Sequence, residues 1–161
     1  MTPFPATACA GLVLSLCLGM LNPSAARAQS PAQGSVNFPV VTLNAGIYVI
    51  RAELANTYET RMQGLMFRKA LGPNEGMIFV FPENEKHCMW KKNTLVPLSV
   101  AFIDAKAQVV SIHDMEPQTE MSHCAAAPAR YALEMAAGWF RVKGIARGAR
   151  ISGIDKLPGP R

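Results

Sequence analysis

The sequence predicts a mostly-β fold, a single compact β-barrel or sandwich with one short α-helix and one disulfide. Short runs of β-branched and aromatic residues follow one another closely, with turn residues between them. Only one segment has both a helix start and a helix stop, and only two cysteines follow the N-terminal apolar stretch. Many short strands with one helix favour a barrel or sandwich over alternating strand–helix units.

Residues 1–28 have the pattern of a secretory signal peptide. An apolar run from Ala8 to Leu21 precedes Ala26-Arg27-Ala28, which has the small-x-small form of a signal-peptidase site. The run is shorter than the ~20 residues of a bilayer-spanning helix, so we expect no stable membrane span after cleavage. The predicted location is the periplasm, or outside the cell.

The remainder of the chain is expected to form one domain. Residues 29–38 and 156–161 are polar or rich in Pro and Gly, which predicts a flexible leader and a loose tail. Between them, residues 39–155 contain no internal repeat and have room for one core only.

Two hairpins and one buried strand are the clearest β-elements. Val40–Leu43 and Ile47–Leu54 flank Asn44-Ala45-Gly46, and Leu98–Ile103 and Gln108–Ile112 flank a turn at residues 104–107. The continuous apolar run Gly76–Phe81 is typical of a strand buried on both faces. Further strands are expected at the following segments: Cys88–Thr94, Tyr131–Met135 and Arg150–Ile154. Residues 116–128 are predicted to be a loop and residues 138–142 a turn or short helix.

The predicted helix begins after Asn56. Asn56 can act as the N-cap with Glu59 reaching back to it, and Gly64 can end the helix. A side-chain stripe of Tyr58, Met62 and Leu65 then lies on one helix face.

Cys88 and Cys124 are the only cysteines left after signal cleavage. In an oxidising compartment two such cysteines predict a disulfide. A metal site is the alternative, because soft and imidazole ligands suit copper and occur in two clusters. Its candidate ligands are His87, Cys88, Met121, His123 and Cys124. Against it, His87 and Cys88 would point to opposite faces of a regular strand.

A series of short motifs spans most of the mature chain. They are Gly64-Leu65-Met66-Phe67-Arg68, Gly76-Met77-Ile78-Phe79, Trp90-Lys91-Lys92-Asn93-Thr94, Pro97-Leu98, Phe102-Ile103-Asp104, Tyr131-Ala132-Leu133-Glu134 and Ala137-Gly138. In their order and spacing they resemble the bacterial and archaeal domain of unknown function 192 family, from about residue 40 to residue 154. The resemblance implies a compact, mostly-β single domain, often exported, with no established activity.

Two residues depart from the pattern of that family. The family usually has Met where this chain has Lys91, and Asp where this chain has Ser99. If the Asp contributes to a family site, the resemblance implies that this site is altered here.

Six polar or aromatic residues are candidates for a ligand site: Arg68, Trp90, Lys92, Asn93, Thr94 and Glu134. In a structural interpretation Glu134, which lies within an apolar strand, pairs with Arg68 or Lys92, while Asn93 and Thr94 fix a turn. In a functional interpretation Arg68 and Lys92 bind an anionic group in a shallow pocket walled by Trp90.

These observations predict an exported binding or accessory module for a small anionic ligand or envelope component. Copper handling is the alternative, and a hydrolase using His113 and Asp114 is a third. No catalytic residue and no cofactor is predicted, because no nucleophile motif, metalloprotease motif or phosphate loop occurs in the chain. Nucleic acid is not an expected partner, since the 16 Lys and Arg residues are scattered and do not alternate with aromatic side chains.

Overall fold

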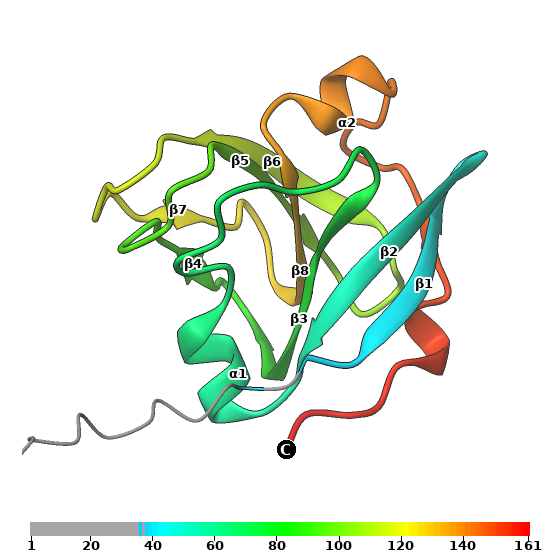
Figure 1. Ribbon diagram of the computed structural model, residues 1–161. Helices are drawn as coiled ribbons and strands as arrows, with labels where there is room; N and C mark the ends of the chain where they lie inside the picture. The colour runs from blue at the N-terminus through cyan, green and yellow to red at the C-terminus, as the bar shows by residue number, and fades with distance from the viewer. Residues whose placement is uncertain (1–35, 37) are drawn as a thin grey trace, which may run out of the picture. The chain divides into compact units, whose positions relative to one another are not determined.

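The computed structural model describes Val36 and residues 38–161 of the chain. Seven strands form one sheet in the order β6-β5-β8-β3-β2-β1-β9, and a separate two-stranded sheet pairs β4 with β7 (Figure 1). The large sheet contains β1 (Val40–Ala45), β2 (Tyr48–Ala55), β3 (Glu75–Glu85), β5 (Leu98–Ile103), β6 (Val109–Met115), β8 (Ala129–Ala136) and β9 (Ile151–Ser152). The small sheet contains β4 (Cys88–Met89) and β7 (His123–Cys124).

Neighbouring strands are antiparallel except β2 and β3, which are parallel. A parallel pair needs a crossover connection, and this crossover contains helix α1 (Tyr58–Gln63). A second short helix, α2 (Trp139–Val142), follows β8, and a 3₁₀ turn occupies Ile154–Lys156. The sequence predicted the first helix outright and the second as a turn or short helix.

The large sheet curls into a half-barrel whose two edges meet at one end. There the backbone N–H of Val109 donates to Ala149 O at 2.9 Å, and that of Ile151 donates to Ala107 O at 2.9 Å. Gln108 and Arg150 form a bridge between these segments. The mostly-β fold predicted from the short strands is therefore confirmed.

Both faces of the central strands are buried. On β8, Leu133 and Met135 belong to the core inside the curl, whereas Ala132 belongs to a second core between the sheet and the α1 side. Residues 76–81 of β3 are all buried, as their uninterrupted apolar sequence predicted.

Cys88 and Cys124 form the predicted disulfide. They are directly opposite each other in the β4–β7 pair, with their sulfur atoms 2.01 Å apart. The bond joins the two strands of the small sheet at one of its two residue pairs.

Several element boundaries differ from the prediction. The first hairpin turns at Gly46 and Ile47, because Ala45 pairs directly with Tyr48. Thr57, not Asn56, caps α1: its hydroxyl accepts from the N–H of Thr60 at 3.2 Å, and the Thr60 hydroxyl accepts from the N–H of Thr57 at 2.9 Å. The strand expected at residues 88–94 stops after Met89 and continues as turns.

Asn56 instead holds the C-terminal tail, which the sequence suggested would be loose. Its side-chain amide donates to Gly159 O at 2.9 Å, and its backbone oxygen accepts from the N–H of Arg161 at 2.7 Å. The segment after the 3₁₀ turn is thereby attached to the start of α1.

The predicted signal peptide, residues 1–28, and most of the predicted leader, residues 29–38, lie outside the described residues. Among the helices that the structure does describe, none is both long and apolar enough to cross a membrane.

Candidate functional site

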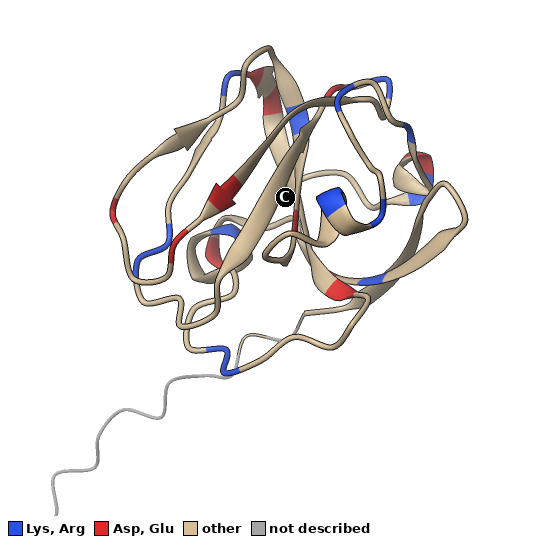
Figure 2. Cartoon of the chain, turned by 90° about the horizontal axis from the view of Figure 1, so that it is seen from above, with Lys and Arg blue, Asp and Glu red and all other residues tan. Residues whose placement is uncertain are grey.

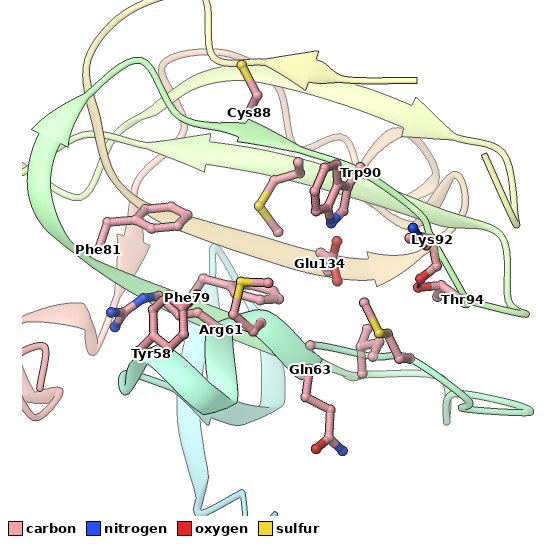
Figure 3. A pocket seen from close by; sticks show the side chains of 15 residues that line it. Tyr58, Arg61, Gln63, Phe79, Phe81, Cys88, Trp90, Lys92, Thr94 and Glu134 are labelled. Atoms are coloured by element: carbon pink, nitrogen blue, oxygen red, sulfur yellow. Dashed lines mark hydrogen bonds between the residues drawn. The ribbon is translucent and has the colours of Figure 1, made fainter. Parts of the chain in front are cut away.

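A pocket of about 250 Å³ opens between α1, β3 and the segment that begins with β4 (Figure 3). Most of its walls are aromatic, thioether or aliphatic side chains, and a few polar groups converge on it. The lining residues are Tyr58, Arg61, Met62, Gln63, Gly64, Leu65, Met66, Phe79, Phe81, Cys88, Met89, Trp90, Lys92, Thr94 and Glu134. Apolar walls with few polar groups are typical of small-ligand sites, and this volume is slightly below their usual range of about 300–1,000 Å³.

The apolar stripe of α1 faces this pocket. Tyr58 and Met62 are 66% and 48% exposed, whereas Leu65 is buried at 2%. The sequence predicted that these three side chains share a face, but helical spacing alone does not distinguish a core-facing stripe from a pocket wall. Phe79 and Phe81, from β3, form an adjoining wall.

Glu134 lies at the floor of the pocket. It occupies the middle of β8, opposite Met77 of β3 and Val100 of β5, and only 3% of it is exposed. In Figure 3 its carboxylate lies below the Trp90 indole, with Thr94 and Lys92 to one side and the phenylalanines to the other. Burial raises the pKa of Glu134 to about 7, and the nearby Lys91 opposes this rise.

Lys91 is the cation whose charge acts on Glu134, although it does not line the pocket. It is completely buried, and its ammonium donates to Val96 O at 3.0 Å. Burial lowers the pKa of Lys91 to about 8, while the charge of Glu134 acts to raise it. The residue that departs from the family pattern is therefore a buried cation that acts on the carboxylate lining the pocket.

Arg68 is not part of the pocket. Its guanidinium donates to both carboxylate oxygens of Glu53 on β2. The interpretation in which Glu134 pairs with Arg68 or Lys92 is thus wrong, because Lys92 pairs with Glu120 at 3.3 Å. Sequence could not reveal either partner, since both are distant in the chain.

The other predicted ligand residues divide between two depressions. Trp90, Lys92 and Thr94 line the pocket with Glu134, whereas Asn93 lies with Lys92 in a neighbouring depression. Trp90 is 51% exposed, which suits a pocket wall. The predicted turn is present, with the N–H of Thr94 donating to Lys91 O at 3.2 Å.

The structure does not gather the predicted metal ligands. Cys88 and Cys124 are joined in the disulfide, and His87 stacks on Phe81 with its Nε2 2.9 Å from Glu83 O. His123 lies next to a different histidine, His113, with ring centroids 6.0 Å apart. Within residues 38–161, no three His, Cys, Asp or Glu side chains are grouped closely enough to hold a metal ion.

His113 and Asp114 do not act on a common point. As neighbours on β6 their side chains leave opposite faces of the strand. Asp114 accepts from the Ser99 hydroxyl and lies 3.3 Å from an Arg141 guanidinium nitrogen. The Ser99 hydroxyl also accepts from the N–H of Gly138 at 2.8 Å, so Ser99 connects β5, β6 and the turn before α2.

Sequence reasoning predicted the Trp90 wall but missed Arg61 and the walls formed by Phe79 and Phe81. Arg61 donates to Val80 O at 3.1 Å and lines the pocket beside Tyr58. Its position one turn after Tyr58 is a weak signal, because most such arginines on short helices are simply solvated. Phe79 and Phe81 were placed in the buried strand, with no sign that their outer side borders a cavity.

Comparisons with known proteins agree with this architecture. The model of the domain of unknown function 192 family, described as uncharacterised, matches residues 40–153. No curated protein matches the chain. A solved protein from Novosphingobium aromaticivorans DSM 12444, of unknown function, is 33% identical with a TM-score of 0.69, over 80% of this chain and 94% of its own.

A second solved structure, described as a proposed transcription regulator from Sinorhizobium meliloti 1021, is also 33% identical. Its TM-score is 0.68, and the match covers 74% of this chain and 97% of that one. The family match extends over most of the described domain and includes the strands and the α1 segment that build the pocket. The chain belongs to the domain of unknown function 192 family.

Proposed function

We propose that this protein is an exported binding module that takes a small, largely apolar ligand with one hydrogen-bond donor group. The ligand body lies between the aromatic and methionine walls of the pocket, and its donor group meets the Glu134 carboxylate. One observation carries the proposal: a carboxylate that is 3% exposed lines an apolar pocket.

A buried carboxylate is costly unless it is paired, hydrogen-bonded or protonated. The pKa of Glu134 is governed by burial and by the charge of Lys91, with no hydrogen bond contributing. A ligand donor would therefore supply an interaction that the described domain does not. Because such a bond is charge-assisted, it is roughly twice as strong as a neutral one.

The charges around the pocket do not favour an anionic ligand. Arg68 is bound to Glu53, Lys92 to Glu120, and Arg61 to the Val80 carbonyl. Of these three cations only Arg61 lacks a carboxylate partner, and an anion entering the pocket would also meet the Glu134 carboxylate. This argues against the anion-binding hypothesis and for a neutral donor.

Export is supported by the signal-like residues 1–28 and by the disulfide, since disulfides persist in oxidising compartments.

The charge distribution of this chain does not support the nucleic-acid binding that the description of the Sinorhizobium protein as a transcription regulator would suggest. Figure 2 shows Lys and Arg distributed over several sides of the domain and interspersed with Asp and Glu. Binding to a nucleic-acid backbone requires a basic patch or stripe.

Three probes of one shape test the proposed ligand class. They are 4-methylphenol, which carries a donor, toluene, which lacks one, and 4-methylbenzoate, which is anionic. Binding to the purified oxidised domain is followed by chemical shifts of the Trp90 indole and the Met62, Met66 and Met89 methyl groups. Above the pKa of Glu134 we expect 4-methylphenol to bind at least tenfold more tightly than toluene, and 4-methylbenzoate to bind most weakly.

Two variants assign the preference to Glu134. Glu134→Gln keeps the size of the side chain and removes its charge, so the preference for 4-methylphenol over toluene is expected to fall severalfold. Arg68→Gln is the matched control outside the pocket and is expected to bind all three probes as the wild type does. Tightest binding of 4-methylbenzoate, lost in Arg68→Gln, would contradict the proposal and restore the anion hypothesis.

A further inference from the structure

His113 has a buried nitrogen with no partner. Its Nε2 is the one buried side-chain nitrogen or oxygen, within residues 38–161, that makes no hydrogen bond. The ring packs edge-on against Phe102, with centroids 5.9 Å apart. A buried polar atom without a partner is uncommon in a folded protein and calls for a ligand or a strained role.

A second imidazole lies next to this nitrogen's ring. His123, on β7, has its ring centroid 6.0 Å from that of His113, with the two planes inclined at 51°. The disulfide fixes β7 to β4, and the N–H of Ala126 donates to the Ser111 hydroxyl of β6 at 3.2 Å. These two connections hold the segment carrying His123 over the strand carrying His113, so the imidazole pair is built into the fold.

The separation of the rings fits a shared metal ion. A metal–imidazole nitrogen bond is about 2.0–2.1 Å, and the ring centroid lies roughly 1.1 Å behind the nitrogen, so each centroid is about 3.2 Å from the ion. Two imidazoles on opposite sides of one ion therefore have centroids up to about 6.4 Å apart. The observed 6.0 Å is within this limit, and for an ion faced by one nitrogen of each ring it corresponds to a wide angle, between trigonal and linear.

The number of donors restricts the kind of ion. In the described part of the chain no third His, Cys, Asp or Glu joins the pair. Structural zinc takes four protein ligands, and calcium or magnesium takes six or more oxygens. A monovalent soft cation of the copper(I) type accepts two nitrogens in a near-linear arrangement, and imidazole is among its ligands.

Burial and the nearby His123 both lower the pKa of His113, while a hydrogen bond to the Cys124 backbone acts to raise it.

We propose that His113 and His123 form a two-imidazole site for copper(I), separate from the pocket over Glu134. The site uses neither cysteine, since both are in the disulfide, and it does not use His87, whose Nε2 lies against Glu83 O. It therefore differs from the ligand set that the sequence suggested, and it makes copper handling compatible with an oxidised protein.

Silver(I) is the probe, because it is an air-stable and diamagnetic analogue of copper(I). Silver nitrate is titrated into the oxidised protein in chloride-free buffer, and the ring nitrogens are followed by long-range ¹H–¹⁵N spectra. We expect one equivalent to bind and to shift one nitrogen each of His113 and His123, with no change at His87. The same stoichiometry is expected for copper(I), measured anaerobically against a coloured chelator.

Three variants decide the assignment. His113→Gln and His123→Gln are each expected to weaken silver binding at least tenfold, while His87→Gln is the matched control and binds like the wild type. His123 lies on the short strand β7, so His123→Gln is expected to fold and tests the site even if His113→Gln, which changes a residue with a buried nitrogen, does not fold. Failure of the wild type to bind silver overturns the proposal. Unchanged binding by His123→Gln, with the shifts confined to methionine methyl groups, also overturns it.

Discussion

Glu134 and Lys91 are two buried ionisable residues, and each affects the ionisation of the other. Lys91 is fully buried and donates to a backbone carbonyl, and its charge favours the ionised form of Glu134. Burial acts in the opposite direction and is the larger effect on both groups. The carboxylate at the pocket floor is therefore balanced between its two protonation states near neutral pH.

This balance predicts a dependence of stability on pH. Because the pKa of Glu134 in the folded chain is raised from 4.5 to about 7, its contribution to stability is fully present below pH 4.5 and is lost as pH rises toward 7. The lowered pKa of Lys91, about 8, acts only above this window. The free energy of unfolding of the wild type, relative to Glu134→Gln, is expected to fall between pH 4.5 and 7 in urea titrations. Parallel curves for the two proteins across that interval would show that Glu134 titrates normally.

By contrast, replacing Arg68 is expected to have little effect on the free energy of unfolding. The side chains of Arg68 and Glu53 are 42% and 24% exposed, so solvent screens much of their attraction. Arg68→Gln is expected to cost no more than about 1 kcal/mol of stability. Urea unfolding measures this, and a double-mutant cycle with Glu53→Gln checks it. A coupling of several kcal/mol would mean that the pair is far less screened than its exposure implies.

The sequence was informative about which residues matter and much less about which of them meet. Trp90, Lys92, Thr94 and Glu134 do share a pocket, but Arg68 does not. A charged side chain selects its partner in three dimensions, so the attraction of Arg68 for Glu53 on β2 leaves no trace in local spacing. The set of metal ligands predicted from the sequence omitted His113 for the same reason, because His113 and His123 are close only in the folded chain, where the segment that carries β7 packs on β6.

At the level of elements, strands were more predictable than the segments between them. The run at residues 76–81 is apolar throughout because β3 is covered on both faces, and this pattern is local. The segment after Met89 has strand-like residues but turns, because Lys91 is drawn inward to Val96 O and Thr94 closes back on Lys91. Longer-range bonds also hold this turn, since the N–H of Lys91 donates to Thr119 O at 3.1 Å and that of Phe67 donates to Asn93 O at 2.9 Å, and they override the local preference.

Gly76 allows β3 to lie close to the part of β8 that carries Glu134. It pairs with Met135 at the beginning of β3, next to Glu134, and a Cβ at this position would collide with the Glu134 backbone oxygen and the Met135 sulfur. Close approach of β3 and β8 thus requires a residue without a side chain.

Gly76→Ala is therefore expected to destabilise the domain by about 2–4 kcal/mol, because the backbone must shift to admit the methyl group. Denaturant unfolding measures the loss. Gly159→Ala is the matched control, since a Cβ there meets no atom, and it should stay within about 0.5 kcal/mol of the wild type. Equal stability of both variants would show that β3 and β8 are less tightly packed than described.

For the molecule as a whole, the disulfide joins the two strands of the small sheet, one of which borders the pocket. Cys88 lines the pocket, and the bond closes a loop with a sequence separation of 36 residues. The small sheet has only two residues in each strand, so its own ladder contributes little. Cysteine count and predicted compartment were sufficient to predict this bond, because the first is given by composition and the second by the signal-like pattern of residues 1–28.

Replacing both cysteines with serine is expected to lower the free energy of unfolding by about 4 kcal/mol in the chain-entropy model. Because β4 forms one pocket wall, the double variant is also expected to bind 4-methylphenol more weakly even where it is folded. Denaturant unfolding and the probe titration measure the two effects separately. A variant that loses stability but keeps full affinity would show that the β4 wall is positioned by other contacts.

The most direct test of the pocket is the ¹³C resonance of the Glu134 carboxyl carbon during a titration with 4-methylphenol. We expect a saturable shift of this resonance and a lowered pKa of Glu134 in the bound state. The carboxyl resonance of Glu53, which is paired with Arg68, should not shift. A ligand that saturates the domain while the Glu134 resonance and its pKa stay fixed would contradict the account.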